Sequence, residues 1–109
     1  MKTRSCSEQL HNMWQLSMGP NDEPSLLTFL QSGDLPRVLS YPKGRANMKV
    51  EPAVGERVVI TCKGMERALG IIQYGFHQTQ RGLVANVIVT DIVYEMTPRR
   101  GQRRNWTQL

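Results

Sequence analysis

Cationic side chains cluster at two places in this 109-residue chain, and an aromatic side chain stands beside one of the clusters. Guanidinium groups contact phosphates, and an aromatic ring offers a surface on which a base can stack. Trp106 follows the first cluster closely, so cation and ring could act on one ligand. Two basic clusters could border one groove. The clusters are Arg99, Arg100, Arg103 and Arg104 near the C-terminal end, and Lys43, Arg45 and Lys49 in mid-chain.

The overall charge points in the same direction. The chain has 14 Lys and Arg against 9 Asp and Glu, a formal net charge of +5. A basic surface attracts polyanions such as nucleic acids. The alternative is a solvated surface that keeps a small protein soluble.

Four side chains could in principle bind zinc, but their spacing argues against it. No two of them form a Cys-x-x-Cys or His-x-x-x-His pair, so no local geometry prepares a site. We expect no metal and no cofactor, with Cys62 in the interior of a strand. The four are Cys6, His11, Cys62 and His77.

The length allows one domain with a single modest core. We expect residues 1–10 to be a flexible lead and residues 11–109 to be the domain. The lead is charged and polar and does not resemble a signal peptide, and no apolar window is long enough to span a bilayer. We therefore expect a cytoplasmic protein, and leave open whether it is a monomer or a dimer.

In the first half of the domain, the sequence pattern predicts one strand, one helix and a long irregular segment. Residues 11–17 alternate, which places Met13 and Gln15 opposite Trp14 and Leu16 in a strand. Helix signals follow over 24–32, with Pro24 in the first turn and Gly33 beyond the end. The apolar face of this helix would carry Leu26, Leu27 and Leu30. Proline, glycine and charged residues predict irregular structure over 35–52.

The second half predicts strands over 57–62, 67–76 and 84–94, the last two joined by residues 77–82. Asp91 interrupts an apolar face, so it must lie at a bulge, pair with an arginine or point into a polar cavity. Trp106 and Leu109 could dock back on the core as a closing turn. The expected fold is α+β: a small barrel of about five or six strands with one or two short helices.

Several short motifs follow one another over residues 12–96. The opening motif, at 13–20, is an aromatic strand that ends in a proline turn, and a Val-Gly-Glu strand entry follows at 54–60. In order and spacing these motifs resemble the EVE domain, a member of the PUA-like superfamily that also includes the YTH and ASCH domains. No tryptophan occurs between residues 35 and 47, where such families place a pocket aromatic, which leaves Tyr41 as the candidate. The segments that carry the resemblance are 13–20, 44–49, 54–60 and 68–72.

The resemblance implies a PUA-like barrel that acts as a non-catalytic reader of DNA or RNA. Its pocket would accept one base, with or without a modification, turned out of the strand. Trp14 and Tyr41 are our candidates for the aromatic walls; the alternatives are that Trp14 is a core residue, as a tryptophan in a first strand more often is, and that Tyr41 is a surface residue. The candidates for the base edge, by polar type, are Ser17, Ser40 and Asn47. The candidates for phosphate contact are Arg45, Lys49, Arg99, Arg100, Arg103 and Arg104.

Two alternatives remain. ASCH-type relatives include hydrolases of modified nucleosides that use lysine and carboxylate groups, and Lys49, Lys63, Glu56 and Glu66 could supply such a set. No spacing fixes a nucleophile beside a base, which disfavours catalysis. The other alternative is a protein-interaction module whose basic tail binds an acidic partner.

Overall fold

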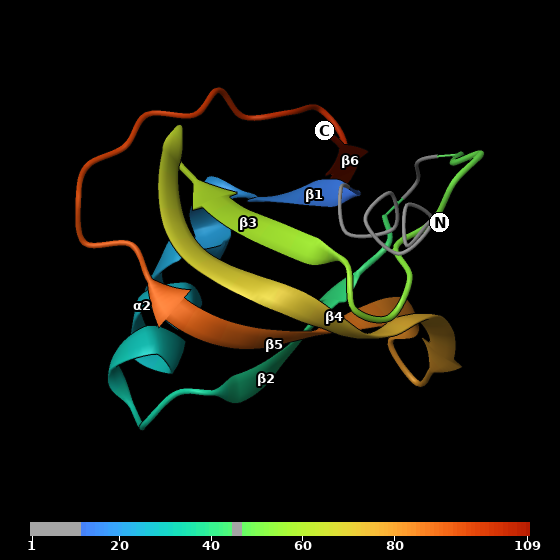
Figure 1. Ribbon diagram of the computed structural model, residues 1–109, viewed down its shortest axis with the longest axis horizontal. Coiled ribbons are helices and arrows are strands. Elements are labelled where there is room, and N and C mark those ends of the chain that lie inside the picture. Colours follow the sequence, from blue (N-terminus) through green and yellow to red (C-terminus); the bar gives the residue numbers. More distant parts are fainter. Residues whose placement is uncertain (1–11, 45–46) are drawn as a thin grey trace, which may run out of the picture.

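The computed structural model describes residues 12–44 and 47–109; the expected lead, residues 1–10, lies outside them. Six strands form one mixed sheet in the order β2-β5-β4-β3-β1-β6, and one α-helix packs on it (Figure 1). β1 and β3 run parallel and the other neighbours run antiparallel. The elements are β1 (Met13–Met18), the 3-10 turn η1 (Pro20–Asp22), α2 (Glu23–Gln31), β2 (Arg37–Pro42), β3 (Arg57–Cys62), β4 (Met65–Thr79), β5 (Gly82–Ile92) and β6 (Trp106–Gln108).

The alternation predicted for the first strand is confirmed. Trp14 and Leu16 lie in the hydrophobic core, and Gln15 lies on the opposite face of β1. In the core, Trp14 lies opposite Val58 and Leu16 lies opposite Ile60, across the parallel strands β1 and β3. Both strands are buried on both faces for most of their length, which explains the unbroken apolar run in β3.

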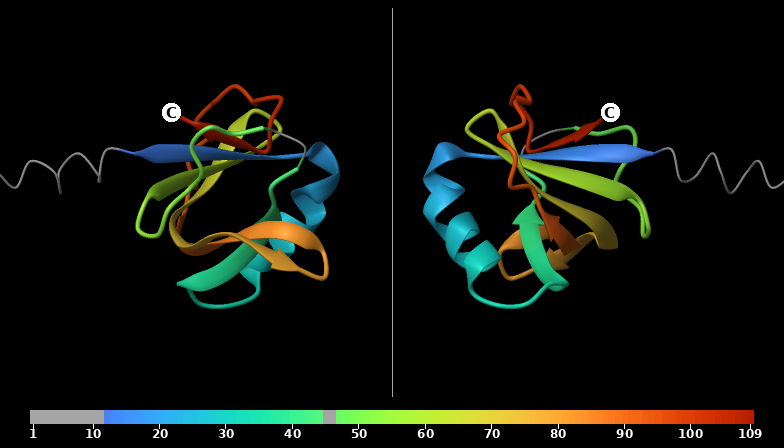
Figure 2. Two further views of the ribbon diagram at one scale, coloured as in Figure 1. Left: turned by 90° about the vertical axis from the view of Figure 1, so that its right-hand side faces the viewer. Right: turned by 60° about the vertical axis from the view of Figure 1, so that its left-hand side comes forward.

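The predicted helix is also confirmed and covers the core side of the sheet (Figure 2). Pro24 lies in its first turn, where the missing N–H has no intrahelical partner to lose. Leu26 and Leu30, four residues apart, are buried in the core. The side chain of Leu27, which we assigned to the same face, is instead 37% exposed.

The segment from 35 to 52 is not irregular throughout, because it contains strand β2. This strand lies at one edge of the sheet and pairs with β5, with Ser40 opposite Asn86. Leu39 is its only buried apolar side chain, so the strand carries almost no hydrophobic signal. Pro42 ends it, and an edge position tolerates a residue without an N–H.

The three strands predicted in the second half are present, but β4 and β5 are longer at their shared end. Residues 77–79 belong to β4, and only Gln80 and Arg81 form the turn. Gly82 follows with a positive φ of 96°, a conformation that glycine adopts without steric penalty. The sequence therefore predicted the hairpin and overestimated its loop.

Asp91 follows a bulge, one of the three alternatives we allowed. Leu69 pairs with Asp91 and Gly70 pairs with Val89, so Thr90 is the extra residue on β5. The bulge reverses the alternation and turns Asp91 to the surface, away from the face of Val89. Its carboxylate accepts a hydrogen bond of 2.8 Å from the Thr90 hydroxyl.

The segment after β5 runs beside the β3–β4 turn, crosses β1 and returns as β6 (Figure 1). Trp106 is 1% exposed and packs in the core, as predicted. The docking predicted for Leu109 is wrong: its side chain is 50% exposed, although its N–H donates to the Met13 carbonyl.

The two edges of the sheet meet at one point without pairing as strands. The side chains of Asn105 and Trp106 donate hydrogen bonds of 3.3 and 3.0 Å to the carbonyl of Pro42 at the end of β2. The described residues therefore form a small compact α+β fold around an open, curled six-stranded sheet. No helix within the described ranges has the length and apolar character needed to cross a membrane.

Candidate nucleic-acid interface

Trp14 lies in the core, the alternative that the sequence left open. Its indole is 1% exposed, and its Nε1 donates a 2.8 Å hydrogen bond to the Glu56 carboxylate. The same carboxylate accepts hydrogen bonds from the Asn12 side chain and the Ala53 backbone. Burial raises the pKa of the Glu56 carboxyl, but the three donors together lower it below its ordinary value. Trp14 and Glu56 thus tie β1 to the entry of β3.

A hollow beside β6 brings together residues from three separate parts of the chain. We call it the β6 groove; its lining includes Trp14, Asn47, Lys49, Arg104, Trp106 and Thr107, and its volume is about 540 Å³. That volume is within the range of small-molecule sites. Four of the residues that we singled out from the sequence therefore border one hollow: Trp14, Asn47, Lys49 and Arg104.

The chemistry of the β6 groove suits a nucleotide. Lys49 and Arg104 are exposed cations that can contact a phosphate, while Asn47 and Thr107 supply polar groups that can contact a base edge. Trp106 is fixed by its hydrogen bond to Pro42 and by an edge-on contact with Phe76, with ring centroids 5.7 Å apart. Because both tryptophans are buried, the groove has a rigid floor but no open aromatic wall.

Ser17 belongs to a buried polar network that holds the basic segment in place. Its hydroxyl accepts hydrogen bonds of 3.2 Å from both the Gln15 amide and the Gln102 backbone N–H. The Gln15 amide also donates to the carbonyl of Arg100, at 2.9 Å. Thr61 on β3 completes the network. Ser17, predicted to contact a base, here positions the segment that carries the arginines.

The predicted cations differ in their surroundings. Arg99 forms an ion pair with Glu66, 2.6 Å between Nε and Oε2. Arg100 and Arg103 are exposed on the segment that precedes β6. Arg45 lies outside the described residues.

Tyr41 and Ser40 do not join the β6 groove. Tyr41 contributes to a hollow between α2 and β2, where its hydroxyl donates a hydrogen bond to the Asp22 carboxylate. Burial and this carboxylate raise the pKa of Tyr41 to about 12. The Ser40 hydroxyl donates to Oδ1 of Asn86, at 2.7 Å.

The four residues considered for catalysis have separate partners. Glu56 accepts from Trp14, and Glu66 pairs with Arg99. Lys63 pairs with Glu23, 2.9 Å between Nζ and Oε1, and Lys49 lines the β6 groove. The fold therefore does not assemble them as one lysine and carboxylate set.

Of the possible zinc ligands, Cys62 and His77 lie within the described residues. Cys62 is buried, and burial raises the pKa of its thiol. Nδ1 of His77 lies 2.9 Å from the carbonyl oxygen of Gly75. Cys6 and His11 lie outside the described residues, and within those residues no three His, Cys, Asp or Glu side chains could hold one metal ion.

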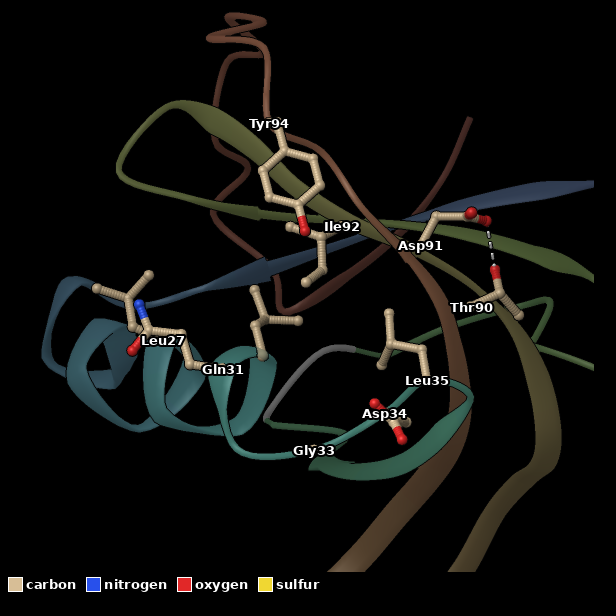
Figure 3. Close-up of a pocket in the computed structure, with 10 residues that line it drawn as sticks. Leu27, Gln31, Gly33, Asp34, Leu35, Thr90, Asp91, Ile92 and Tyr94 are labelled. Carbon is tan, nitrogen blue, oxygen red and sulfur yellow. Dashed lines mark hydrogen bonds between the residues drawn. The ribbon is translucent and has the colours of Figure 1, made fainter.

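A hollow that sequence reasoning missed lies between α2 and the end of β5 (Figure 3). Leu27 of α2, Ile92 of β5 and Leu35 of the segment after α2 converge there, and Tyr94 stands beside them. Asp34 and Asp91 add two exposed carboxylates. The two carboxylates would repel a phosphate at this place.

No protein-family model, no curated protein and no solved structure matches this chain. Its function is therefore argued from its own residues.

Proposed function

We propose that this chain is a non-catalytic nucleic-acid-binding module, and that the β6 groove holds one base of a DNA or RNA strand. The base would be unpaired or turned out of its stack, because a groove of this size cannot admit a duplex. The observation that supports the proposal is the convergence of Asn47, Lys49 and Arg104 on one hollow, although they come from two distant segments.

In this proposal the cations and the polar groups have separate roles. Lys49 and Arg104 contact the phosphates and supply most of the affinity, which falls as salt rises. Asn47 contacts the base edge and supplies preference for one base, including one that carries a modification. Arg100 and Arg103, on the segment that the Ser17 network holds, extend the phosphate contacts.

The proposal includes the PUA-like barrel. The hydrogen bonds from Asn105 and Trp106 to Pro42 bring the two edge strands together, as expected if the curled sheet is an incompletely closed barrel of that type. The EVE-like motifs in the sequence support the same interpretation.

The test is fluorescence-anisotropy binding to single-stranded DNA and RNA oligonucleotides, with and without methylated bases, at two salt concentrations. Lys49→Glu and Arg104→Glu should weaken binding to all sequences. The loss of each phosphate contact should also reduce the slope of the logarithm of the binding constant against the logarithm of the salt concentration by about 1. Asn47→Ala should instead reduce the preference between bases, by about 1–3 kcal/mol.

Arg57→Glu is the matched control, because it makes the same change of charge at an exposed position that does not line the groove. An equal loss in Arg57→Glu and Lys49→Glu would mean that only net charge matters and would contradict the groove. Release of product from a panel of modified nucleosides would favour a hydrolase instead.

A further inference from the structure

A second polar hollow lies at the far end of the β4–β5 hairpin. We call it the hairpin hollow; its lining includes Ser40, Pro42, His77, Gln80, Arg81 and Asn86, and its volume is about 530 Å³. Ser40 and Asn86 are paired neighbours on β2 and β5. They alternate along their strands with the buried residues Leu39 and Val87, so the hollow is on the face of the sheet that points away from the core.

The groups in the hairpin hollow can recognise both parts of a nucleotide. Arg81 is an exposed cation in the turn, held by a 3.1 Å hydrogen bond from its backbone N–H to the Thr79 hydroxyl. The Gly75 carbonyl can only accept, so Nδ1 of His77 carries the hydrogen, and Nε2 is left for a ligand. Asn86 accepts from Ser40 with Oδ1 and donates one amide hydrogen to Oε1 of Gln73, at 3.4 Å, which leaves the other hydrogen for a ligand.

Beside the hollow, Tyr74 offers the aromatic surface that the β6 groove lacks. Its side chain is 57% exposed, and its ring meets the His77 ring edge-on, with centroids 6.1 Å apart. The register of β4 against β5 shifts on both sides of Tyr74, at the bulges that bend this part of the hairpin. An exposed aromatic ring beside hydrogen-bonding groups and a cation is the arrangement on which single-stranded bases stack.

Pro42 connects this face with the β6 groove. It lines the hairpin hollow, and its carbonyl accepts the hydrogen bond from the Trp106 indole, which lines the β6 groove. The hydrogen bond between Trp106 and Pro42 therefore connects the linings of the two hollows, at the point where the edges of the sheet meet. A single strand, whose bases are unpaired, could extend from one hollow to the other.

We propose that the hairpin hollow binds a second nucleotide of the same strand, with its base stacked on Tyr74 and its phosphate on Arg81, so that the ligand is single-stranded. This inference rests on the proposed function, because it takes the β6 groove as the first contact. It adds the strandedness of the ligand and a binding residue, Tyr74, that lies outside the β6 groove.

The experiment compares oligonucleotides of about four and about eight nucleotides, both within the range of about 4–16 nucleotides that one OB-fold domain covers. The wild-type protein should bind the longer one more tightly than the shorter one. Tyr74→Ala should weaken binding of the longer one by about 5- to 150-fold, the range for one stacked base. Arg81→Glu should also weaken binding of the longer oligonucleotide. In both variants, most of the difference in affinity between the longer and the shorter oligonucleotide should disappear.

Two control variants match these changes. Tyr94→Ala removes a tyrosine that is 85% exposed in the acidic hollow of Figure 3, and Arg57→Glu reverses a charge outside both sites. Circular dichroism would check that every variant is folded. Both controls should bind the longer oligonucleotide as the wild type does.

The outcomes separate the two proposals. If Lys49→Glu weakens binding while Tyr74→Ala and Arg81→Glu leave the length dependence unchanged, the proposed function stands and the second site is wrong. If the wild type binds neither oligonucleotide, or if Lys49→Glu and Arg104→Glu have no effect, the proposed function itself fails. Duplex binding as tight as single-strand binding would overturn the inference about strandedness.

Discussion

At the scale of single residues, Glu56 is the clearest case of a polar group whose position the fold requires. The Val-Gly-Glu entry places its carboxylate where three donors, from Asn12, Trp14 and Ala53, point at it. A carboxylate can accept several hydrogen bonds at once, and no neutral side chain of its length accepts as many. Glu56 therefore has a structural role, and the Val-Gly-Glu motif marks a contact that holds the fold together.

We expect Glu56→Ala to destabilise the protein by at least about 2 kcal/mol, because it leaves the buried Trp14 N–H without an acceptor. Urea denaturation followed by tryptophan fluorescence measures this change. Glu56→Gln, which keeps one acceptor oxygen, should lose less. A loss in Glu56→Ala no larger than that of an exposed glutamate such as Glu51→Ala would contradict the assignment.

The same residue predicts a pH dependence. The folded-state pKa of Glu56 lies below its ordinary value of 4.5, so its contribution is fully present above that pH and is lost as pH falls through the folded pKa. The free energy of unfolding of the wild type should therefore fall more steeply below pH 4.5 than that of Glu56→Ala. Parallel curves for the two proteins would count against this role.

At the scale of elements, the close contact between β4 and β5 explains why residue 70 is a glycine. A Cβ on Gly70 would lie 2.5 Å from the Ile88 carbonyl oxygen and 2.6 Å from a methyl group of Val87. The first of these is backbone and cannot move without disturbing β5. The glycine of the Ala-Leu-Gly pattern is therefore needed because β4 and β5 pack so closely.

Gly70→Ala should destabilise the protein by about 1–3 kcal/mol through overpacking, measured as a shift of the denaturation midpoint. Gly101→Ala makes the same chemical change in open space and should leave the midpoint almost unchanged. Equal midpoints for the two variants would show that β4 and β5 can separate at little cost.

The buried network between β1 and the arginine segment makes a second prediction at this scale. Ser17→Ala removes the acceptor of the Gln102 N–H, so the exchange of that amide should accelerate by more than the change in global stability explains. The loss of stability should be about 1 kcal/mol. Hydrogen exchange followed by NMR would reveal the difference, and an unchanged Gln102 amide would refute the role of Ser17 as an anchor.

At the scale of the whole molecule, the sheet order determines which distant residues meet. Lys49 and Arg104 border one groove because β6 returns to pair with β1, beside the segment 47–50. Pro42 and Trp106 meet because β2 and β6 are the two edges of a curled sheet. The candidate sites are products of topology more than of local motifs.

This distinction separates what the sequence could predict from what it could not. The alternation around Trp14 and the apolar run of β3 follow from local periodicity, and both are confirmed. The periodicity also marked Asp91 as an exception, and the bulge beside it is one of the three alternatives that this left open. β2 was missed because an edge strand with one buried residue has no such periodicity. The Ser17 network and the Arg99 ion pair join residues far apart in the chain, and no local pattern encodes them.

Contact between the two edges can be tested with Trp106→Phe. This change keeps an aromatic ring against Phe76 but removes the indole N–H that reaches Pro42. We expect a loss of about 2–3 kcal/mol, from the smaller ring and the unpaired carbonyl, and faster amide exchange in β2 than in β3. Asn105→Ala, which removes the longer and more exposed hydrogen bond to Pro42, should have a much smaller effect. Uniform acceleration in both strands would argue that the edges act independently.

The parallel pairing of β1 with β3 has a consequence for the order of folding. The β4–β5 hairpin closes over a two-residue turn, and β3 joins it through another short turn, so these strands can assemble early. β1 must wait for β3, which lies far along the chain, and β6 must wait for β1. Among the strands within the described residues, β1 leaves the ribosome before the others, yet it finds its partner only after residues 57–62 have followed.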